Sequence, residues 1–274
     1  MGLIRKQLER LSRGKTLWRR LPAPFSKARV LVTPDAALSY LKPGAKWCDP
    51  ELIRIADLFL KPGDVVWDIG ANVAIFGAAC AVRCGTQGMV LCIEPDTLLS
   101  GLIRRTAQRL PPECAKIDVL CAAVAEEPGV GEFLIAEHGR ASNALAKYNG
   151  RKNMGSVRER HLVPVVTLDH LLTCTRPPTF LKIDVEGAEV GIFKGANRLL
   201  ATARPTMYVE VGQTNSQIVA DQLRDAGYVL YDPTQPIDGQ SPLDQCSWNT
   251  LAMPSERASQ RIDGTPARSG AETV

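Results

Sequence analysis

The chain alternates short apolar runs of strand length with longer segments whose apolar residues recur at helical spacing. The apolar runs predict strands near 65–69, 89–93, 117–121, 179–184, 206–211 and 227–231. The helical spacing predicts helices near 50–60, 73–83, 97–110, 187–200 and 215–226. Strands that alternate with helices in this way indicate an α/β fold, in which right-handed crossovers build a mainly parallel sheet.

One interval, about 126–166, departs from this alternation because it is rich in turn-forming and polar residues. Short strands are expected inside it at 130–135 and 162–166. An irregular insert at the ligand edge of a sheet is typical of a lid or a substrate-binding segment. We therefore divide the chain into a basic leader (1–45), a main domain (46–254) that carries this insert, and a disordered polar tail (255–274).

The composition is that of a globular protein, with 274 residues, 45% hydrophobic and 23% charged. No window approaches ~18 uninterrupted apolar residues, and no apolar stretch follows the basic N-terminus, so neither a transmembrane helix nor a secretory signal is expected. The eight cysteines form no CxxC pair. We expect reduced thiols, no cysteine metal site and a cytoplasmic protein. Neither a Gly-x-Ser-x-Gly elbow nor a Walker A sequence occurs, which argues against hydrolases and P-loop NTPases.

The net charge of +4 is unevenly distributed, because the N-terminus is strongly basic and the rest of the chain is net acidic. Residues 1–30 carry nine Lys and Arg residues against Glu9 alone, with leucines between them. The pattern can form a basic helix on an anionic membrane surface or a polyanion, but a solvated, partly ordered extension is the more common outcome of such charged runs. Peripheral membrane contact is therefore one expectation. Nucleic acid is a poorer one, because Trp18 is the only aromatic residue among residues 1–24.

The most informative turn follows the first predicted strand of the sheet, which ends near Asp68. Ligands of open α/β sheets bind at this edge. Gly70 lets the backbone approach a ligand closely, and Asn72 can cap the next helix, whose N-terminus suits the carboxylate of an amino-acid moiety. Because no further glycine occurs before Gly77, the turn is not the G-x-G-x-x-G pyrophosphate cradle of nicotinamide-binding proteins.

The ends of the next two strands carry complementary chemistry. Glu94 follows the second strand and precedes Pro95. Acids at two adjacent strand ends suit a ribose, whose two hydroxyls donate hydrogen bonds. The third strand ends in small residues around Ala122, against which a flat ring can lie, although ordinary packing explains them equally well.

Another strand-to-helix turn holds three acids within six residues, Asp184, Glu186 and Glu189. Glu186 and Glu189 are expected to enter the first turn of the following helix, where the macrodipole favours an acid, so Glu189 can be merely structural. Asp184 and Glu186 can take a proton, hold a hydroxyl substrate or bind a hard divalent cation. Lys182 lies on the same sheet face as Asp184 and can pair with it. In the insert, His138 can act as a base or orient a substrate.

With these motifs in view, the chain resembles the FkbM-type S-adenosylmethionine-dependent methyltransferases from about residue 51 to 254. The most specific match is Leu181-Lys182-Ile183-Asp184-Val185-Glu186-Gly187-Ala188-Glu189, with further matches at Asp68-Ile69-Gly70-Ala71-Asn72, Glu94-Pro95, Ser142-Asn143-Ala144-Leu145 and Trp248 to Pro254.

The resemblance implies a Rossmann-like class I methyltransferase fold, with a mainly parallel seven-stranded sheet and helices on both faces. It implies methyl transfer from S-adenosylmethionine to a hydroxyl of a sugar, a glycolipid or a secondary metabolite. By position, Asp68, Gly70 and Asn72 line the methionine end of the cofactor and Glu94 holds the ribose. Asp184 and Glu186 border the acceptor.

Asp184 is the first candidate for the general base, followed by Glu186 and His138, and a divalent cation is the alternative to a base. RNA methylation and a cofactor-binding scaffold without catalysis are the alternative functions. Family members usually carry glycine where this chain has Ala74. If that position has a positive φ, alanine costs about 1–2 kcal/mol there.

Overall fold

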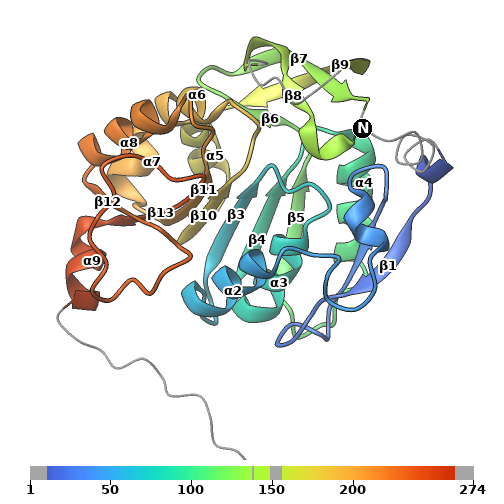
Figure 1. Cartoon of the computed structure of the whole chain (residues 1–274), viewed down its shortest axis with the longest axis horizontal. Helices are drawn as coiled ribbons and strands as arrows, with labels where there is room; N and C mark the ends of the chain where they lie inside the picture. Colours follow the sequence, from blue (N-terminus) through green and yellow to red (C-terminus); the bar gives the residue numbers. More distant parts are fainter. Residues whose placement is uncertain (1–10, 138, 149–155, 263–274) are drawn as a thin grey trace, which may run out of the picture.

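The computed structural model describes residues 11–137, 139–148 and 156–262. Its centre is a seven-stranded sheet in the order β12-β13-β11-β10-β3-β4-β5 (Figure 1). Only β13 runs antiparallel to its neighbours in this sheet, so the expected mainly parallel α/β sheet is confirmed. The strands are β3 (Val65–Ile69), β4 (Met89–Ile93), β5 (Lys116–Leu120), β10 (Phe180–Ile183), β11 (Thr206–Glu210), β12 (Tyr228–Tyr231) and β13 (Asn249–Pro254).

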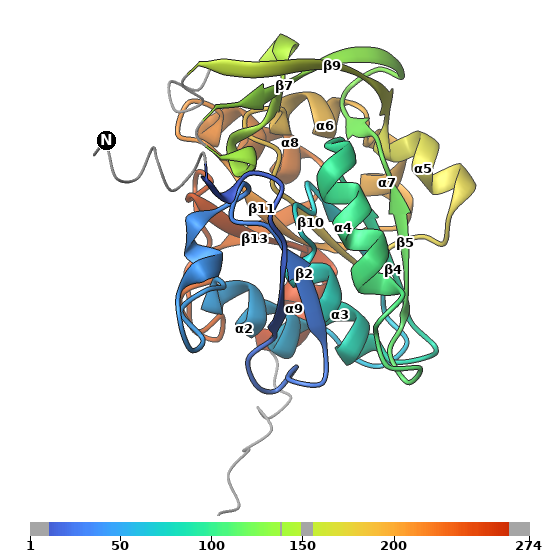
Figure 2. The same ribbon diagram turned by 90° about the vertical axis from the view of Figure 1, so that its right-hand side faces the viewer.

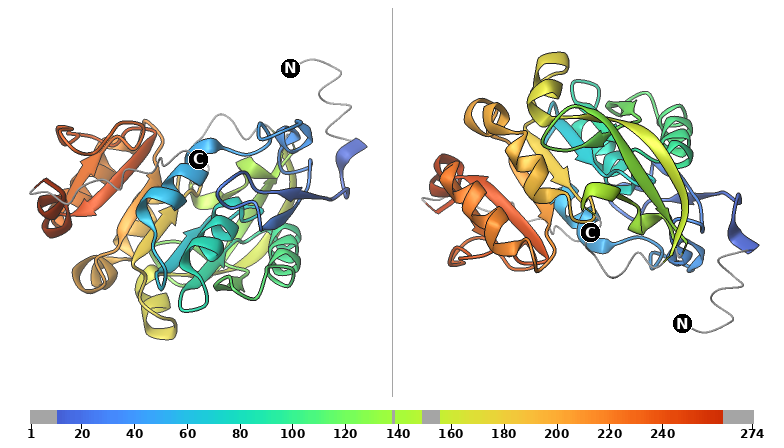
Figure 3. Two further views of the ribbon diagram at one scale, coloured as in Figure 1. Left: turned by 90° about the horizontal axis from the view of Figure 1, so that it is seen from below. Right: turned by 90° about the horizontal axis from the view of Figure 1, so that it is seen from above.

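Helices cover both faces of this sheet, as the alternation along each strand requires (Figure 3). In β3, Val66 packs into one core cluster, whereas Val65 and Trp67 pack into the other. The Val66 face is covered by α2 (Pro50–Phe59), α3 (Ile75–Cys84) and α4 (Thr97–Ala107). The opposite face is covered by α5 (Leu168–Cys174), α6 (Glu189–Lys194), α7 (Asn197–Thr202) and α8 (Ser216–Asp225).

The single helix expected at 187–200 is two helices, α6 and α7, separated at Gly195. A Cβ atom at Gly195 would lie 2.7 Å from the carbonyl oxygen of Ala125, so the backbone here approaches the start of the insert closely. Asp169 then caps α7, accepting hydrogen bonds from the N–H groups of Arg198 at 3.0 Å and Leu199 at 2.8 Å. The break places α7 against α5.

The N-terminal boundary differs from the expected one, because residues 17–45 are part of the main domain. An antiparallel pair, β1 (Leu17–Arg20) and β2 (Arg29–Val32), packs on α4, and a 3₁₀ turn, η1 (Leu38–Leu41), follows it (Figure 2). Leu21 and Leu31 are each 1% exposed, and the N–H of Leu31 donates to Oγ1 of Thr106 at 3.0 Å. The second half of the basic segment therefore forms a strand pair with buried leucines instead of an amphipathic helix. Residues 1–10 lie outside the described part of the chain.

The basic side chains of this segment are also used within the fold. Arg19 donates to the carbonyl oxygen of Lys42 at 2.7 Å and stacks over the ring of Trp47 at 5.2 Å. Lys27 lies 3.5 Å from the carboxylate of Glu113. These contacts tie part of the expected leader to the domain surface.

The insert is a small sheet rather than an irregular loop. Its order is β6-β9-β7-β8, and it lies across the carboxyl ends of the central strands (Figures 1 and 3). The two strands expected at 130–135 and 162–166 are confirmed and are longer than predicted. The elements are β6 (Ala123–Val124), β7 (Gly129–Ala136), η2 (Arg140–Ser142), β8 (Ala144–Leu145), η3 (Ala146–Tyr148) and β9 (Val157–Val166).

The expected disordered tail begins with a helix, α9 (Ser255–Ile262), which packs on β13 and β12. Ala258 of α9 is 4% exposed and joins a core cluster with Tyr231 and Met253. Residues 263–274 lie outside the described part. Within the described part of the chain, no helix is both long and apolar enough to cross a membrane.

Candidate active site

A cleft of about 610 Å³, counted with its open mouth, lies between the carboxyl ends of the central strands and the insert. Its volume is within the range of small-molecule sites. Six of the eight residues singled out from the sequence line this cleft: Gly70, Asn72, Glu94, Ala122, Asp184 and Glu186. The other two are Asp68, which lies beneath the cleft, and His138, which lies outside the described residues.

Gly70 brings the first turn into close contact with β10. Its φ is +71°, and a Cβ atom there would lie 1.8 Å from the carbonyl oxygen of Asp184. The N–H groups of Gly70 and Ala71 both donate to the carbonyl oxygen of Ile93, at 2.9 and 3.1 Å. The ends of β3, β4 and β10 therefore meet at this residue, and only glycine fits there.

Asn72 does not cap the next helix, contrary to the expectation. The helix α3 begins at Ile75, and its N-cap position is Ala74, which makes no side-chain cap hydrogen bond. Asn72 and Ala74 both have left-handed backbones, with φ of 53° and 58°. Ala74 therefore has the positive φ at which an alanine is expected to be strained. Asn72 is one of the residues that line the cleft, and its Oδ1 atom is buried without a hydrogen-bond partner among the described residues.

Glu94 is a buried acid fixed at both carboxylate oxygens. Its Oε2 atom accepts from the N–H of Asn72 at 2.9 Å, and its Oε1 atom accepts from the N–H of Asp96 at 2.9 Å. Burial raises the pKa of Glu94 to about 8, although these two backbone hydrogen bonds act in the opposite direction. Only 5% of the residue is exposed, at the wall of the cleft. The geometry leaves a fixed acceptor facing the ligand space.

Asp68 is fully buried and holds the turn from below. Its Oδ2 atom accepts from the N–H of Gly77 in α3 at 3.1 Å, and its Oδ1 atom lies 3.4 Å from Nζ of Lys182. Glycine at position 77 brings α3 close to β4, because a Cβ atom there would lie 2.6 Å from Sγ of Cys92. Asp68 therefore shapes the turn rather than lining the cleft.

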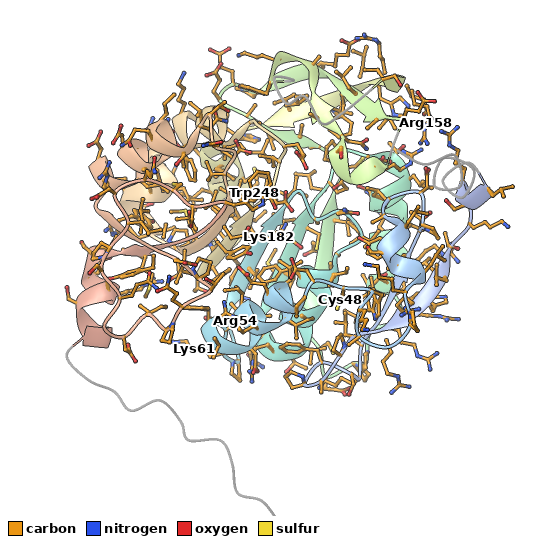
Figure 4. The ribbon with its side chains drawn as sticks, viewed as in Figure 1. Cys48, Arg54, Lys61, Arg158, Lys182 and Trp248 are labelled. Atoms are coloured by element: carbon orange, nitrogen blue, oxygen red, sulfur yellow. The ribbon has the colours of Figure 1, made fainter. Side chains whose placement is uncertain are left out.

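Lys182 joins this turn to the acids on the other side of the cleft, and Figure 4 labels it near the centre of the sheet. Its Nζ atom lies 3.3 Å from Oδ2 of Asp184 and 3.3 Å from the carbonyl oxygen of Gly70. The pairing expected between Lys182 and Asp184 is thus present. Burial lowers the pKa of Lys182, but the carboxylates of Asp184, Asp68 and Glu210 outweigh burial and raise it, so the amine is protonated.

Asp184, Glu186 and Glu210 have carboxylate oxygens within 4.8 Å of one another, a spacing that can hold a metal ion. Glu186 lies in the turn before α6, with φ of 52°. The expectation that it enters the first turn of the helix is therefore wrong. Glu189 is the first residue of α6 and is fully buried, where it accepts hydrogen bonds from Gly187 and Asn215. Its expected structural role is confirmed by these contacts.

The insert contributes residues that were not selected from the sequence. Phe133, Arg140, Asn143 and Leu145 line the cleft opposite the strand ends. Only the family-like Ser142 to Leu145 stretch pointed to this part of the insert. His161 and His170 do not line the cleft: His161 pairs with Glu159 and His170 contacts Cys174.

Residues 68–230, more than half of the chain, match the family model of the methyltransferase FkbM domain. The match begins at Asp68 and includes every candidate residue named above. No curated protein matches the chain.

Solved structures of methyltransferases are also similar to the chain. Methyltransferase FkbM from Methylobacillus flagellatus KT is 15% identical over 91% of this chain and 58% of its own, with a TM-score of 0.46. Precorrin-6y C5,15-methyltransferase from Geobacter metallireducens GS-15 is 12% identical over 74% and 85%, with a TM-score of 0.42. Aeropyrum pernix fibrillarin, solved with natively bound S-adenosyl-L-methionine, is 10% identical over 88% and 85%, with a TM-score of 0.41.

Proposed function

The chain belongs to the FkbM methyltransferase family, and from this premise we propose that it transfers a methyl group from S-adenosylmethionine to a hydroxyl oxygen of a sugar, a glycolipid or a secondary metabolite. One observation carries the proposal. The two candidate acceptor-side acids, Asp184 and Glu186, line the same cleft as Gly70, Asn72 and Glu94.

The lining of the cleft suits this cofactor. Asn72 adds a side-chain amide, a hydrogen-bonding group suited to the amino-acid moiety, to the residues that line the cleft, and Gly70 allows the backbone to lie against that moiety. The fixed carboxylate of Glu94 suits the ribose hydroxyls. Ala122, which is 1% exposed, supplies a small flat wall for the adenine ring.

S-adenosylmethionine supplies an electrophilic methyl group on a sulfonium, which leaves as a neutral thioether. Most of the task of the protein is therefore orientation. Holding the acceptor oxygen in line with the methyl carbon and the sulfur can supply about 7–11 kcal/mol of the barrier reduction. Phe133 and Leu145 of the insert add apolar side chains to the cleft, which favour a drier environment along this line.

Asp184 is the proposed general base. An alcohol is a weak nucleophile, so its proton has to leave as the oxygen–carbon bond forms, and Asp184 would accept it. Lys182 fixes the Asp184 carboxylate at the edge of β10. Glu186 and His138 remain the second and third candidates for this role.

A divalent cation held by Asp184, Glu186 and Glu210 is the alternative way to activate the hydroxyl, since it would lower the pKa of the bound alcohol. One measurement distinguishes the general base from the divalent cation. Activity that survives exhaustive chelation favours Asp184 as the base, whereas activity that is lost and then restored by Mg²⁺ or Mn²⁺ favours the cation.

The proposed function is tested by incubating the protein with S-adenosylmethionine labelled in the methyl group and a panel of acceptors. The panel contains neutral saccharides, glycolipids, hydroxylated polyketides and RNA. Label recovered in an ether linkage of a saccharide, glycolipid or polyketide supports the proposal. Label recovered only in RNA, or no transfer despite cofactor binding, contradicts it and favours one of the two alternative functions.

A further inference from the structure

The residue that links the insert to the cofactor side of the cleft is Arg140, which lies in η2. Its side chain is 9% exposed and bridges two acids from distant parts of the chain. Its NH1 atom donates to Oδ2 of Asp96 at 2.5 Å, and its Nε atom donates to Oδ2 of Asp35 at 2.9 Å. Both acids are buried, at 0% and 7% exposure.

Asp96 connects this bridge to the proposed ribose site. Its backbone N–H donates to Glu94, so the position of Asp96 sets one of the two hydrogen bonds that fix the Glu94 carboxylate. Every oxygen of the Asp96 side chain is engaged. Oδ1 caps α4 through the N–H of Leu98 at 2.9 Å, and Oδ2 accepts from Arg140 and from Nδ2 of Asn143 at 2.9 Å.

Asp35 extends the same network to the N-terminal segment. Its carboxylate also accepts from Arg158 of β9, with NH1 to Oδ1 at 2.9 Å, and its carbonyl oxygen accepts from the N–H of Arg140 at 3.0 Å. Figure 4 labels Arg158 on the insert side of the molecule. Asp35, Asp96, Arg140 and Arg158 form the buried part of this network, and the half-exposed Glu159 adds a third acid 3.0 Å from Nε of Arg158 and 3.9 Å from NH2 of Arg140. A network of this kind favours one arrangement of the insert over the strand ends.

We infer that Arg140 is a positioning residue for the ribose of the cofactor, acting through Asp96 on Glu94. The inference rests on the proposed function, because it takes Glu94 as the ribose ligand. Cofactor binding then depends on the insert and on Asp35 as well as on the strand ends. The guanidinium presents two different nitrogens, Nε to Asp35 and NH1 to Asp96, whereas a lysine offers a single nitrogen and loses this fork geometry.

The test uses the full chain and two ligands, S-adenosylhomocysteine and an analogue of it that lacks the 2′- and 3′-hydroxyls. Arg140→Lys keeps the charge and breaks the bridge. We expect the variant to weaken binding of S-adenosylhomocysteine by about tenfold or more in calorimetry, since a hydrogen bond to a charged group is lost. The analogue has no ribose hydroxyls for Glu94 to hold, so its affinity should fall by less than about threefold.

Arg160→Lys is the matched control. Arg160 lies in β9 with 60% of its side chain exposed and pairs at the surface with Glu132 at 2.9 Å, so the affinity for both ligands should stay unchanged. If Arg140→Lys does not fold, Asp35→Asn tests the same bridge with an isosteric side chain and the same expected difference between the ligands. Equal losses for the two ligands would overturn the inference. Failure of S-adenosylhomocysteine to bind the unaltered chain would instead overturn the proposed function.

Discussion

The ammonium nitrogen of Lys182 lies 3.3 Å from Oδ2 of Asp184, the proposed base. The same nitrogen lies 3.4 Å from Oδ1 of the buried Asp68, which is its register partner on β3. One buried cation thus contacts both the acid under the cofactor turn and the acid at the acceptor side. The two halves of the cleft are held in a fixed relation by this side chain.

Replacing Lys182 by methionine should therefore destabilise the protein strongly. The Asp68 carboxylate would lose its cation in the interior, and breaking a buried pair from one side costs about 3–5 kcal/mol. Urea unfolding measures this change in the free energy of unfolding. Lys61→Met is the control, because Lys61 is exposed and lies outside the site.

The pH dependence of Lys182→Met gives a second readout. Burial raises the pKa of Asp68 above that of the unfolded chain even with Lys182 present, and removal of the cation raises it further. The folded variant then binds a proton that the unfolded chain releases, so its stability should fall as the pH rises from about 4. A loss of stability that is small and independent of pH would argue against the ion pair.

Asp184→Asn tests the proposed base. Turnover should fall by about 10²–10⁴-fold, since this is the usual contribution of a general base. Binding of S-adenosylhomocysteine should change by less than about threefold, because the cofactor contacts proposed for Gly70, Asn72 and Glu94 remain. Glu186→Gln is the comparison at the neighbouring acid. Unchanged turnover in Asp184→Asn would remove Asp184 from this role, and a large loss in Glu186→Gln alone would transfer the role to Glu186.

Glu94 should make nucleoside binding depend on pH. Its pKa is raised to about 8 by burial, and its ionised form accepts hydrogen bonds from ribose hydroxyls. Adenosine is the probe, since it carries the ribose without a titrating amino acid. Its affinity should rise with pH by at most about tenfold per unit up to pH 8 and then level off. Glu94→Gln should bind adenosine more weakly and without this dependence.

Glu94 also makes the free energy of unfolding depend on pH, in the direction opposite to its effect on adenosine binding. The unliganded folded protein holds the Glu94 proton up to about pH 8, whereas the unfolded chain releases it near the ordinary value of 4.5. The contribution of Glu94 to stability is therefore present at low pH and is lost as the pH rises through that range. A difference in the free energy of unfolding between the unaltered chain and Glu94→Gln that does not vary with pH would contradict the assignment.

Two substitutions at the first turn separate strain from function. Ala74→Gly relieves about 1–2 kcal/mol of left-handed strain. It also removes a buried methyl group worth about 0.8 kcal/mol and adds about 0.5–1 kcal/mol of glycine entropy. We expect a net change within about 1 kcal/mol and nearly unchanged cofactor affinity. Ala74 would then be no sign of lost function.

Gly70→Ala is the contrasting case, because its new Cβ atom would overlap the carbonyl oxygen of Asp184. We expect it to cost about 2 kcal/mol or more in the free energy of unfolding and to abolish binding of S-adenosylhomocysteine. Calorimetry and thermal unfolding check both variants. Strong cofactor binding by Gly70→Ala would show that the close approach of the two strand ends is not required.

The parts of the site that could be predicted from the sequence follow from strand periodicity. Asp68, Glu94 and Asp184 lie at the ends of apolar runs, and parallel strands bring such ends to one edge. The pairing of Lys182 with Asp184 follows from two-residue alternation along one strand. For the same reason the strands of the insert were recognisable from their apolar residues.

The parts that were missed depend on contacts between distant segments. Nothing near Arg140 in the sequence indicates that its partners are Asp35 and Asp96. The N-terminal strand pair was hidden because its apolar residues, such as Leu31, stand among basic ones and are buried only when α4 is in place. The helix break at Gly195 likewise depends on the backbone of the insert. Tertiary packing decides each of these features.

Calorimetric titration of the full chain with S-adenosylmethionine, with NAD as the comparison ligand, tests the central claim most directly. The account predicts saturable binding of S-adenosylmethionine, loss of most of that affinity in Glu94→Gln, and no heat with NAD. Absence of heat with S-adenosylmethionine at millimolar concentration, together with binding of NAD, would contradict it.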